Sequence, residues 1–153
     1  MSKSAFRCTA VLTAAIFMVL LSILGCKKKE YFPEPGLILN NWSRATQELN
    51  YDVYSKCEAY PREAAVFNEM YKFFYFTNIT IVKVEDLDEK DIRTDFEGKR
   101  FHKRNVIFEC LEVSRGGKSG AKQVKGEVFF IKFIDGSKAK DGWLMANRTL
   151  IRY

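Results

Sequence analysis

The sequence has only one histidine and three prolines among its 153 residues. Three prolines and nine glycines are too few for a collagen-like or proline-rich fibre. With a single histidine, a serine-type triad, a histidine-rich zinc site or a conventional histidine base would each have to use His102. His102 lies in the basic stretch 99–104, where we expect an exposed side chain without a catalytic role.

The composition is that of one globular domain. Hydrophobic residues make up 47% of the chain and charged residues 29%, with a formal net charge of +6. This balance excludes a wholly disordered chain, and the length excludes a multidomain enzyme. The 13 Phe, 7 Tyr and 2 Trp residues each bury a large apolar area, so we expect a well-filled core.

The first 26 residues have the features of an export signal. Lys3 and Arg7 precede the apolar run 10–24, no acidic residue occurs before that run, and Gly25 and Cys26 end it. A membrane-spanning helix needs about 20 apolar residues, so the run 10–24 is short for one. A permanent membrane span is therefore the alternative interpretation.

Residues Ile23-Leu24-Gly25-Cys26 resemble the lipobox of bacterial lipoproteins, with Ile23 at a position that usually carries Leu. The resemblance covers residues 1–26 only. It implies that Cys26 carries the lipid, with acyl chains such as palmitate, and that the chain is cut before Cys26. We therefore expect a signal peptide at 1–25, a lipidated cysteine and tether at 26–35, and a single domain at 36–153.

The resemblance also implies where the protein is found: exported from the cytoplasm and anchored in the bacterial cell membrane or outer membrane. Lys27, in place of Asp, after Cys26 favours the outer membrane in the common sorting pattern of diderm bacteria. Lys27, Lys28 and Lys29 could attract anionic headgroups, or they could simply form a solvated tether. Both interpretations stay open.

Along residues 36–153 the pattern of apolar residues changes from one typical of helices to one typical of strands. Three- and four-residue steps predict one helical face from Ile38, Trp42, Ala45, Leu49, Val53 and Cys57. A second, shorter helix is predicted to start near Pro61, with an apolar stripe made by Ala64, Phe67, Met70, Tyr71 and Phe74. Strands are predicted at 79–84, 105–113, 124–134 and 143–153. This order predicts an α+β fold, with one or two N-terminal helices packed on a curved four-stranded antiparallel sheet.

The order of elements is similar to that of cystatin-like and nuclear-transport-factor-like domains. No sequence motif supports this analogy, and a fold by itself implies no function. Cystatins use a Gln-x-Val-x-Gly hairpin, whereas residues 122–126 have Lys122 in place of the glutamine. We therefore do not expect inhibition of cysteine proteases.

No cluster of residues points to catalysis, a cofactor or a metal. The seven carboxylates of residues 85–97 lack the spacing of a calcium loop and are expected to form a solvated loop. The glycines of residues 115–120 lack the full phosphate-loop pattern and predict a hairpin. Cys57 and Cys110 are expected on elements that pack together, so they form either a disulfide or two buried free thiols.

These observations predict a membrane-anchored envelope lipoprotein with a small, non-catalytic domain for binding or assembly. Its expected partners are the membrane, through Cys26, and an envelope protein, but not a nucleic acid. The alternative is a small-ligand pocket or small enzyme inside the cone between helix and sheet. A cavity filled by Trp42, Phe129 and Ile131 would favour the first function, whereas polar side chains gathered in one deep cavity would favour the second.

Overall fold

The computed structural model describes residues 35–86, 91–117 and 120–152, which belong to a compact unit spanning 32–153. The predicted export signal, Cys26 and the predicted tether up to residue 34 lie outside the described residues. Pro35, which we predicted to be in the tether, is buried in the first turn of a helix. Proline fits there because the first turn leaves its backbone nitrogen without an intrahelical acceptor.

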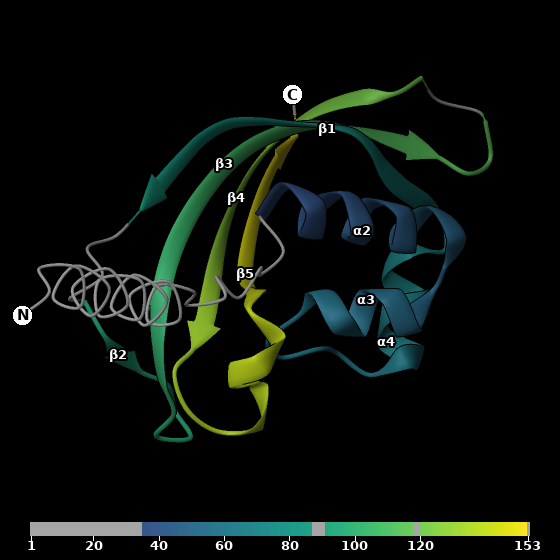
Figure 1. The fold of residues 1–153 in the computed structure, drawn as a ribbon. Coiled ribbons are helices and arrows are strands. Elements are labelled where there is room, and N and C mark those ends of the chain that lie inside the picture. Colours follow the sequence, from purple (N-terminus) through teal and green to yellow (C-terminus); the bar gives the residue numbers. More distant parts are fainter. Residues whose placement is uncertain (1–34, 87–90, 118–119, 153) are drawn as a thin grey trace, which may run out of the picture. The chain divides into compact units, whose positions relative to one another are not determined.

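Within the described residues, three α-helices precede a twisted antiparallel sheet (Figure 1). The elements are α2 (Pro35–Glu48), α3 (Tyr51–Cys57), α4 (Ala64–Tyr71), β1 (Phe74–Asp86), β2 (Arg93–Thr94), β3 (Arg100–Ser114), β4 (Lys122–Phe133), the 3₁₀ helix η1 (Ser137–Asp141) and β5 (Trp143–Arg152). The strand order is β1-β3-β4-β5, with β2 paired to β3. The predicted α+β class and antiparallel meander are therefore confirmed.

The strands are longer than the sequence pattern predicted. β1 and β3 extend beyond residues 79–84 and 105–113 at both ends, and β2 adds a short fifth strand. β2 lies inside the acidic stretch that we expected to be a loop, and Arg93 pairs with Phe101 in the register of β3. The side chains of β2 are exposed, so apolar alternation could not reveal this strand.

The first predicted helix is interrupted, which corrects the prediction of one continuous helical face. Leu49 has a left-handed φ of 54°, and α3 begins after it. Asn50 caps α3 by accepting a hydrogen bond from the backbone N–H of Val53 at 3.2 Å. As a result Leu49, predicted on the buried face, is 37% exposed.

The second helix starts later and is shorter than predicted. Pro61 precedes α4, which begins at Ala64. Of the predicted stripe, Phe67 and Tyr71 are buried, whereas Ala64 and Met70 are exposed and Phe74 already belongs to β1. Two buried aromatic rings, one helical turn apart, are therefore enough to hold α4 on the core.

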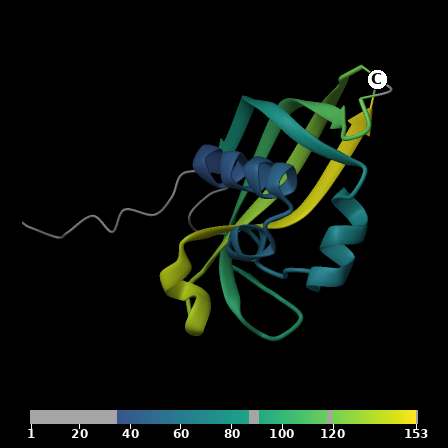
Figure 2. The same ribbon diagram turned by 90° about the vertical axis from the view of Figure 1, so that its right-hand side faces the viewer.

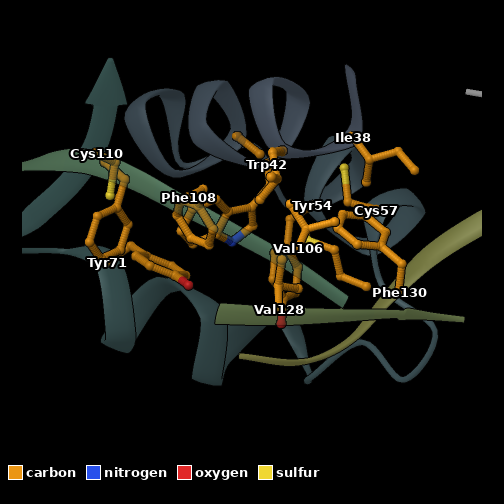
Figure 3. Close-up of a cluster of buried hydrophobic side chains, with 14 of the residues drawn as sticks. Ile38, Trp42, Tyr54, Cys57, Tyr71, Val106, Phe108, Cys110, Val128 and Phe130 are labelled. Atoms are coloured by element: carbon orange, nitrogen blue, oxygen red, sulfur yellow. The ribbon is translucent and has the colours of Figure 1, made fainter. Parts of the chain in front are cut away.

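Trp42 of α2 is fully buried at the centre of the core (Figure 3). Its ring stacks on Phe76 of β1, with 5.0 Å between centroids, and meets the rings of Phe108 and Tyr71 edge-on. On β4, Gly126 leaves room for the Phe108 ring, since a Cβ built on Gly126 would lie 2.3 Å from it. Such contacts between aromatic rings add to the stabilisation from buried area.

Polar side chains of α2 satisfy the backbone of β1. The Ser43 hydroxyl donates to the Phe76 carbonyl oxygen at 2.7 Å, and the Thr46 hydroxyl accepts from the Phe76 N–H at 3.2 Å. Both side chains are buried, so these hydrogen bonds avoid unpaired polar groups. Arg115 then binds the ends of two helices, donating to the carbonyl oxygens of Gln47 and Tyr71.

A smaller apolar cluster contains Ala59, Ile131, Phe133 and Leu144. Successive side chains of a strand point to opposite faces, so Ile131 and Phe133 lie on the face of β4 opposite to Val128 and Phe130. Tyr60, which follows α3, packs against this cluster. The connection from α3 to α4 is therefore held beside β5, where the candidate site is found.

Candidate functional site

A buried carboxylate lies where α3 meets the sheet. Glu58 directly follows α3 and forms an isolated parallel bridge with Met145 of β5. The next residue, Ala59, donates its backbone N–H to the Met145 carbonyl oxygen at 2.8 Å. Only 5% of Glu58 is exposed. A carboxylate this deep is stable only with a partner.

Arg148 of β5 is that partner. Its Nη1 donates to Glu58 Oε1 and also approaches the sulfur of Met145 at 3.7 Å. Its guanidinium carbon lies 5.0 Å from the centre of the Trp42 ring, which places the cation over an aromatic face. Only 14% of the Arg148 side chain is exposed. The ion pair is thus part of the core packing.

The surroundings determine the protonation of this cluster. Burial raises the pKa of Glu58, and the attraction and hydrogen bond of Arg148 oppose that rise. For Arg148 burial acts to lower the pKa, but attraction to Glu58 and Tyr71 outweighs it, so the pKa is raised. Burial also raises the pKa of Tyr54 and Tyr71, which keeps both phenols protonated near neutral pH. Arg148, Tyr54 and Tyr71 are therefore all protonated near neutral pH.

Glu58 also borders an open hollow of about 490 Å³ between α3 and η1. Its lining consists of Ser55, Lys56, Glu58, Pro61, Lys138, Asp141 and Leu144. A second hollow of about 320 Å³, which includes Arg44 and Trp143, shares Lys56 and Asp141 with the first. Because they share lining residues the two hollows adjoin, and together we call them the α3–η1 groove.

The rim of the α3–η1 groove is more basic than acidic. Arg44, Lys56 and Lys138 contribute three cations. Among the described lining residues the carboxylates are Asp141 and Glu58, and Arg148 already pairs with Glu58. Lys138 donates to the carbonyl oxygen of Ala59, which fixes its side chain at the edge of the groove. The groove therefore suits a negatively charged, extended ligand better than a cationic one.

The nucleophiles near the groove are not activated. The Ser55 hydroxyl donates to the Asp52 carbonyl oxygen at 3.2 Å, which is the pattern of a helix side chain bonding to its own backbone. The Cys57 thiol donates to the Val53 carbonyl oxygen at 3.3 Å, and burial raises its pKa to about 12. A thiol with so high a pKa is protonated at neutral pH and therefore unreactive.

Cys57 and Cys110 do not form the disulfide that was one of two expected outcomes. Both are free and buried. They lie at opposite ends of the cluster drawn in Figure 3, with aromatic side chains between them. Burial raises the pKa of Cys110 to about 11, with a smaller contribution from Glu112. The two thiols therefore act as small apolar side chains of the core.

The other residues singled out in the sequence do not contribute to the groove. His102 lies on β3 and is half-buried rather than exposed as expected, and it does not line the groove. Asp95, from the acidic stretch, accepts hydrogen bonds from the N–H groups of Glu97 and Lys99 and so caps a tight turn. Cys26, the predicted lipid attachment residue, lies outside the described residues.

The Glu58–Arg148 pair was missed in the sequence. Glu58 follows Cys57, the last residue of the predicted helical face, and a helical continuation would have turned it outward. Arg148 sits in a strand with mixed alternation, between the polar residues Asn147 and Thr149, where an arginine gives no sign of burial. The only available signal was that both belong to elements expected to pack together.

Neither a membrane-spanning helix nor a metal-binding cluster is found among the described residues. None of their helices is long and apolar enough to cross a membrane. No group of three or more His, Cys, Asp or Glu side chains within ranges 35–86, 91–117 and 120–152 could hold a metal ion. Comparison of the chain with protein-family models, curated proteins and solved structures finds no match.

Loss of Arg148 should destabilise the domain strongly. The change Arg148→Met leaves the buried Glu58 carboxylate without its cation, which costs about 3–5 kcal/mol of unfolding free energy. Urea unfolding measures this loss. The double change Glu58→Gln with Arg148→Met should recover most of it. The matched control is Arg152→Met on the same strand, where the ion pair with Glu112 is 48% exposed on the arginine side and is worth less than about 1 kcal/mol.

The pH dependence of the Arg148→Met variant follows from the same burial. Burial raises the pKa of Glu58, and removal of Arg148 takes away the group that opposes this rise. Between its unfolded and folded pKa values Glu58 binds one more proton in the folded chain, so its contribution to stability is greatest at acid pH and falls as pH rises through that interval. The unfolding free energy of Arg148→Met minus that of the double variant Glu58→Gln with Arg148→Met, measured in steps from acid to neutral pH, should therefore decrease. If this difference increases, the carboxylate is not buried in this way.

Proposed function

We propose that the chain is a lipoprotein of the bacterial cell envelope, anchored through Cys26, whose domain binds an envelope protein without catalysing a reaction. The anchor is supported by the basic start, the short apolar run 10–24 and Gly25 before Cys26. The binding role is supported by the described domain. Its core is closed, and the α3–η1 groove is an open hollow among the described residues.

One observation carries the binding interpretation: aromatic rings fill the space between the helices and the sheet. Trp42, Phe76 and Phe108 have no more than 1% of their surface exposed, and they occupy the region where a cone-shaped fold would hold a ligand. Ile131 is buried as well, but in the smaller cluster, and Phe129 is only half-buried under the ammonium group of Lys103. Of the three residues named in advance, Trp42 fills this space, with Phe76 and Phe108 in place of Phe129 and Ile131.

The chemistry of the α3–η1 groove indicates the kind of partner. An open groove beside an exposed helix can take an extended polypeptide, whereas small ligands are usually enclosed on most sides. The rim cations Arg44, Lys56 and Lys138 favour an acidic segment. We therefore propose an acidic stretch of an envelope protein as the occupant of the groove.

A second function has one observation in its favour. The Glu58–Arg148 pair is a buried polar cluster beside a hollow of about 490 Å³, which is the setting expected for a small-ligand pocket or a small enzyme. Glu58 and Arg148 already pair with each other, and the neighbouring Ser55 hydroxyl and Cys57 thiol are not activated. For this reason we rank it below the binding function.

Capture of the anchored protein from its native envelope tests the binding function. We expect a specific protein to co-purify with the wild-type chain and to be lost when Arg44→Glu and Lys56→Glu reverse the charge of the rim. Lys125→Glu, an exposed change on β4 away from the groove, is the control and should retain that protein. A tightly bound small molecule with no co-purifying protein would favour the second function instead.

Lipid attachment can be tested by substitution of the cysteine itself. The change Cys26→Ser removes the thiol that would accept the diacylglyceryl group, so labelling by a fatty-acid precursor should disappear and the unprocessed chain should run larger on a gel. Cys8→Ser is the matched control, because Cys8 lies within the segment that is removed and labelling should be unchanged. Labelling that survives Cys26→Ser but not Cys8→Ser would contradict the assignment.

A further inference from the structure

Four apolar side chains are exposed together where the domain begins. Leu37 of α2 is 48% exposed, and on β1 the exposed fractions are 36% for Ile81, 54% for Val82 and 43% for Val84. We call these four residues the anchor-side patch. Gly36, next to Leu37, lies against Ile81, whose Cδ1 would be 3.1 Å from a Cβ built on Gly36. Ile81 and Val84 point to the face of β1 that α2 covers, because their partners in β3 are buried in the core. Exposed apolar groups of this kind mark surfaces that contact proteins or membranes.

The position of the anchor-side patch relative to the tether indicates its occupant. Residues 26–34 separate the described domain from Cys26, and nine residues span at most about 30 Å. α2 begins at Pro35, directly before Gly36, and Figure 2 shows β1 running alongside α2. With a lipid on Cys26, this surface can reach the bilayer without the tether having to pass around the domain.

From these observations we infer that the anchor-side patch rests on the surface of the bilayer that holds the acyl chains of Cys26. This inference rests on the proposed lipid anchor and adds the orientation of the domain. Tethering raises the effective concentration of the bilayer at the patch, so a few apolar side chains suffice for contact. Lys83 pairs with Glu85 at 2.5 Å, and Asp86 leaves β1 with a net charge of −1, so the apolar side chains and not the charges supply the attraction.

The depth of contact is limited by the backbone of β1. This strand lies at the edge of the sheet, so part of its N–H and C=O groups lacks a strand partner and needs water or headgroups. The patch therefore lies at headgroup depth and not in the hydrocarbon. Docking of a strand from a partner protein is less favoured, because β1 shifts register at two places and α2 occupies the outward groups of Phe76.

Fluorescent probes on single cysteines test this orientation. In the full, lipidated chain, Val82→Cys carries the test probe and Ile151→Cys the control, since Ile151 has a similar exposed fraction of 53% on the other edge strand. The native thiols of Cys57 and Cys110 do not compete for a thiol-reactive dye, because they are buried and protonated. Each protein is placed in phosphatidylcholine vesicles containing phosphatidylglycerol, with or without brominated acyl chains.

We expect the dye at residue 82 to shift to shorter wavelength and to lose most of its intensity with brominated lipid, while the dye at residue 151 does neither. Equal responses at both positions, or none at residue 82, would overturn the orientation. A shift at residue 82 that occurs in detergent and grows with protein concentration would overturn it too, because a second copy would then cover β1. Flotation of the protein with the vesicles is measured first, so that failure of the anchor itself is recognised separately.

Discussion

The position of Trp42 is the constraint on which the rest of the domain depends. The indole is contributed by α2, yet it contacts Phe76 of β1, Phe108 of β3, Tyr71 of α4 and Arg148 of β5. One fully buried side chain thus joins two helices and three strands. Its aromatic face also lies beneath the buried guanidinium, so the apolar core and the ion pair depend on each other.

Patterns of apolar residues predicted the parts of this fold in which one face is buried. The periodicity of Ile38, Trp42 and Ala45 placed the first helix correctly, and runs of β-branched and aromatic residues identified the central strands β3 and β4. The same periodicity wrongly predicted that this helix continues without interruption to Cys57. It could not show that Leu49 would turn left-handed and that Asn50 would cap a new helix, because a local cap competes with a weak continuation of the helical face.

The candidate site was beyond sequence reasoning for a physical reason. Burial of Glu58 and Arg148 depends on contacts between residues 90 positions apart, and each residue in isolation looks like an ordinary surface charge. The α3–η1 groove likewise forms only when η1 packs beside α3, and η1 falls within a glycine-containing loop that had no helical signal. By contrast, the proposed lipid anchor rests on a local motif within residues 1–26, so the sequence alone is enough to suggest the anchor.

The proposed function combines an anchored N-terminus with a domain that has a filled interior and an open, basic groove. Mass spectrometry of the protein isolated intact from the envelope under native conditions tests this combination most directly. It should show a chain that begins at Cys26 with the added mass of acyl chains, in a complex with another protein and without a small ligand. A chain that begins at Met1 without acyl mass would contradict the central claim, because the apolar run 10–24 would then remain as part of the mature protein.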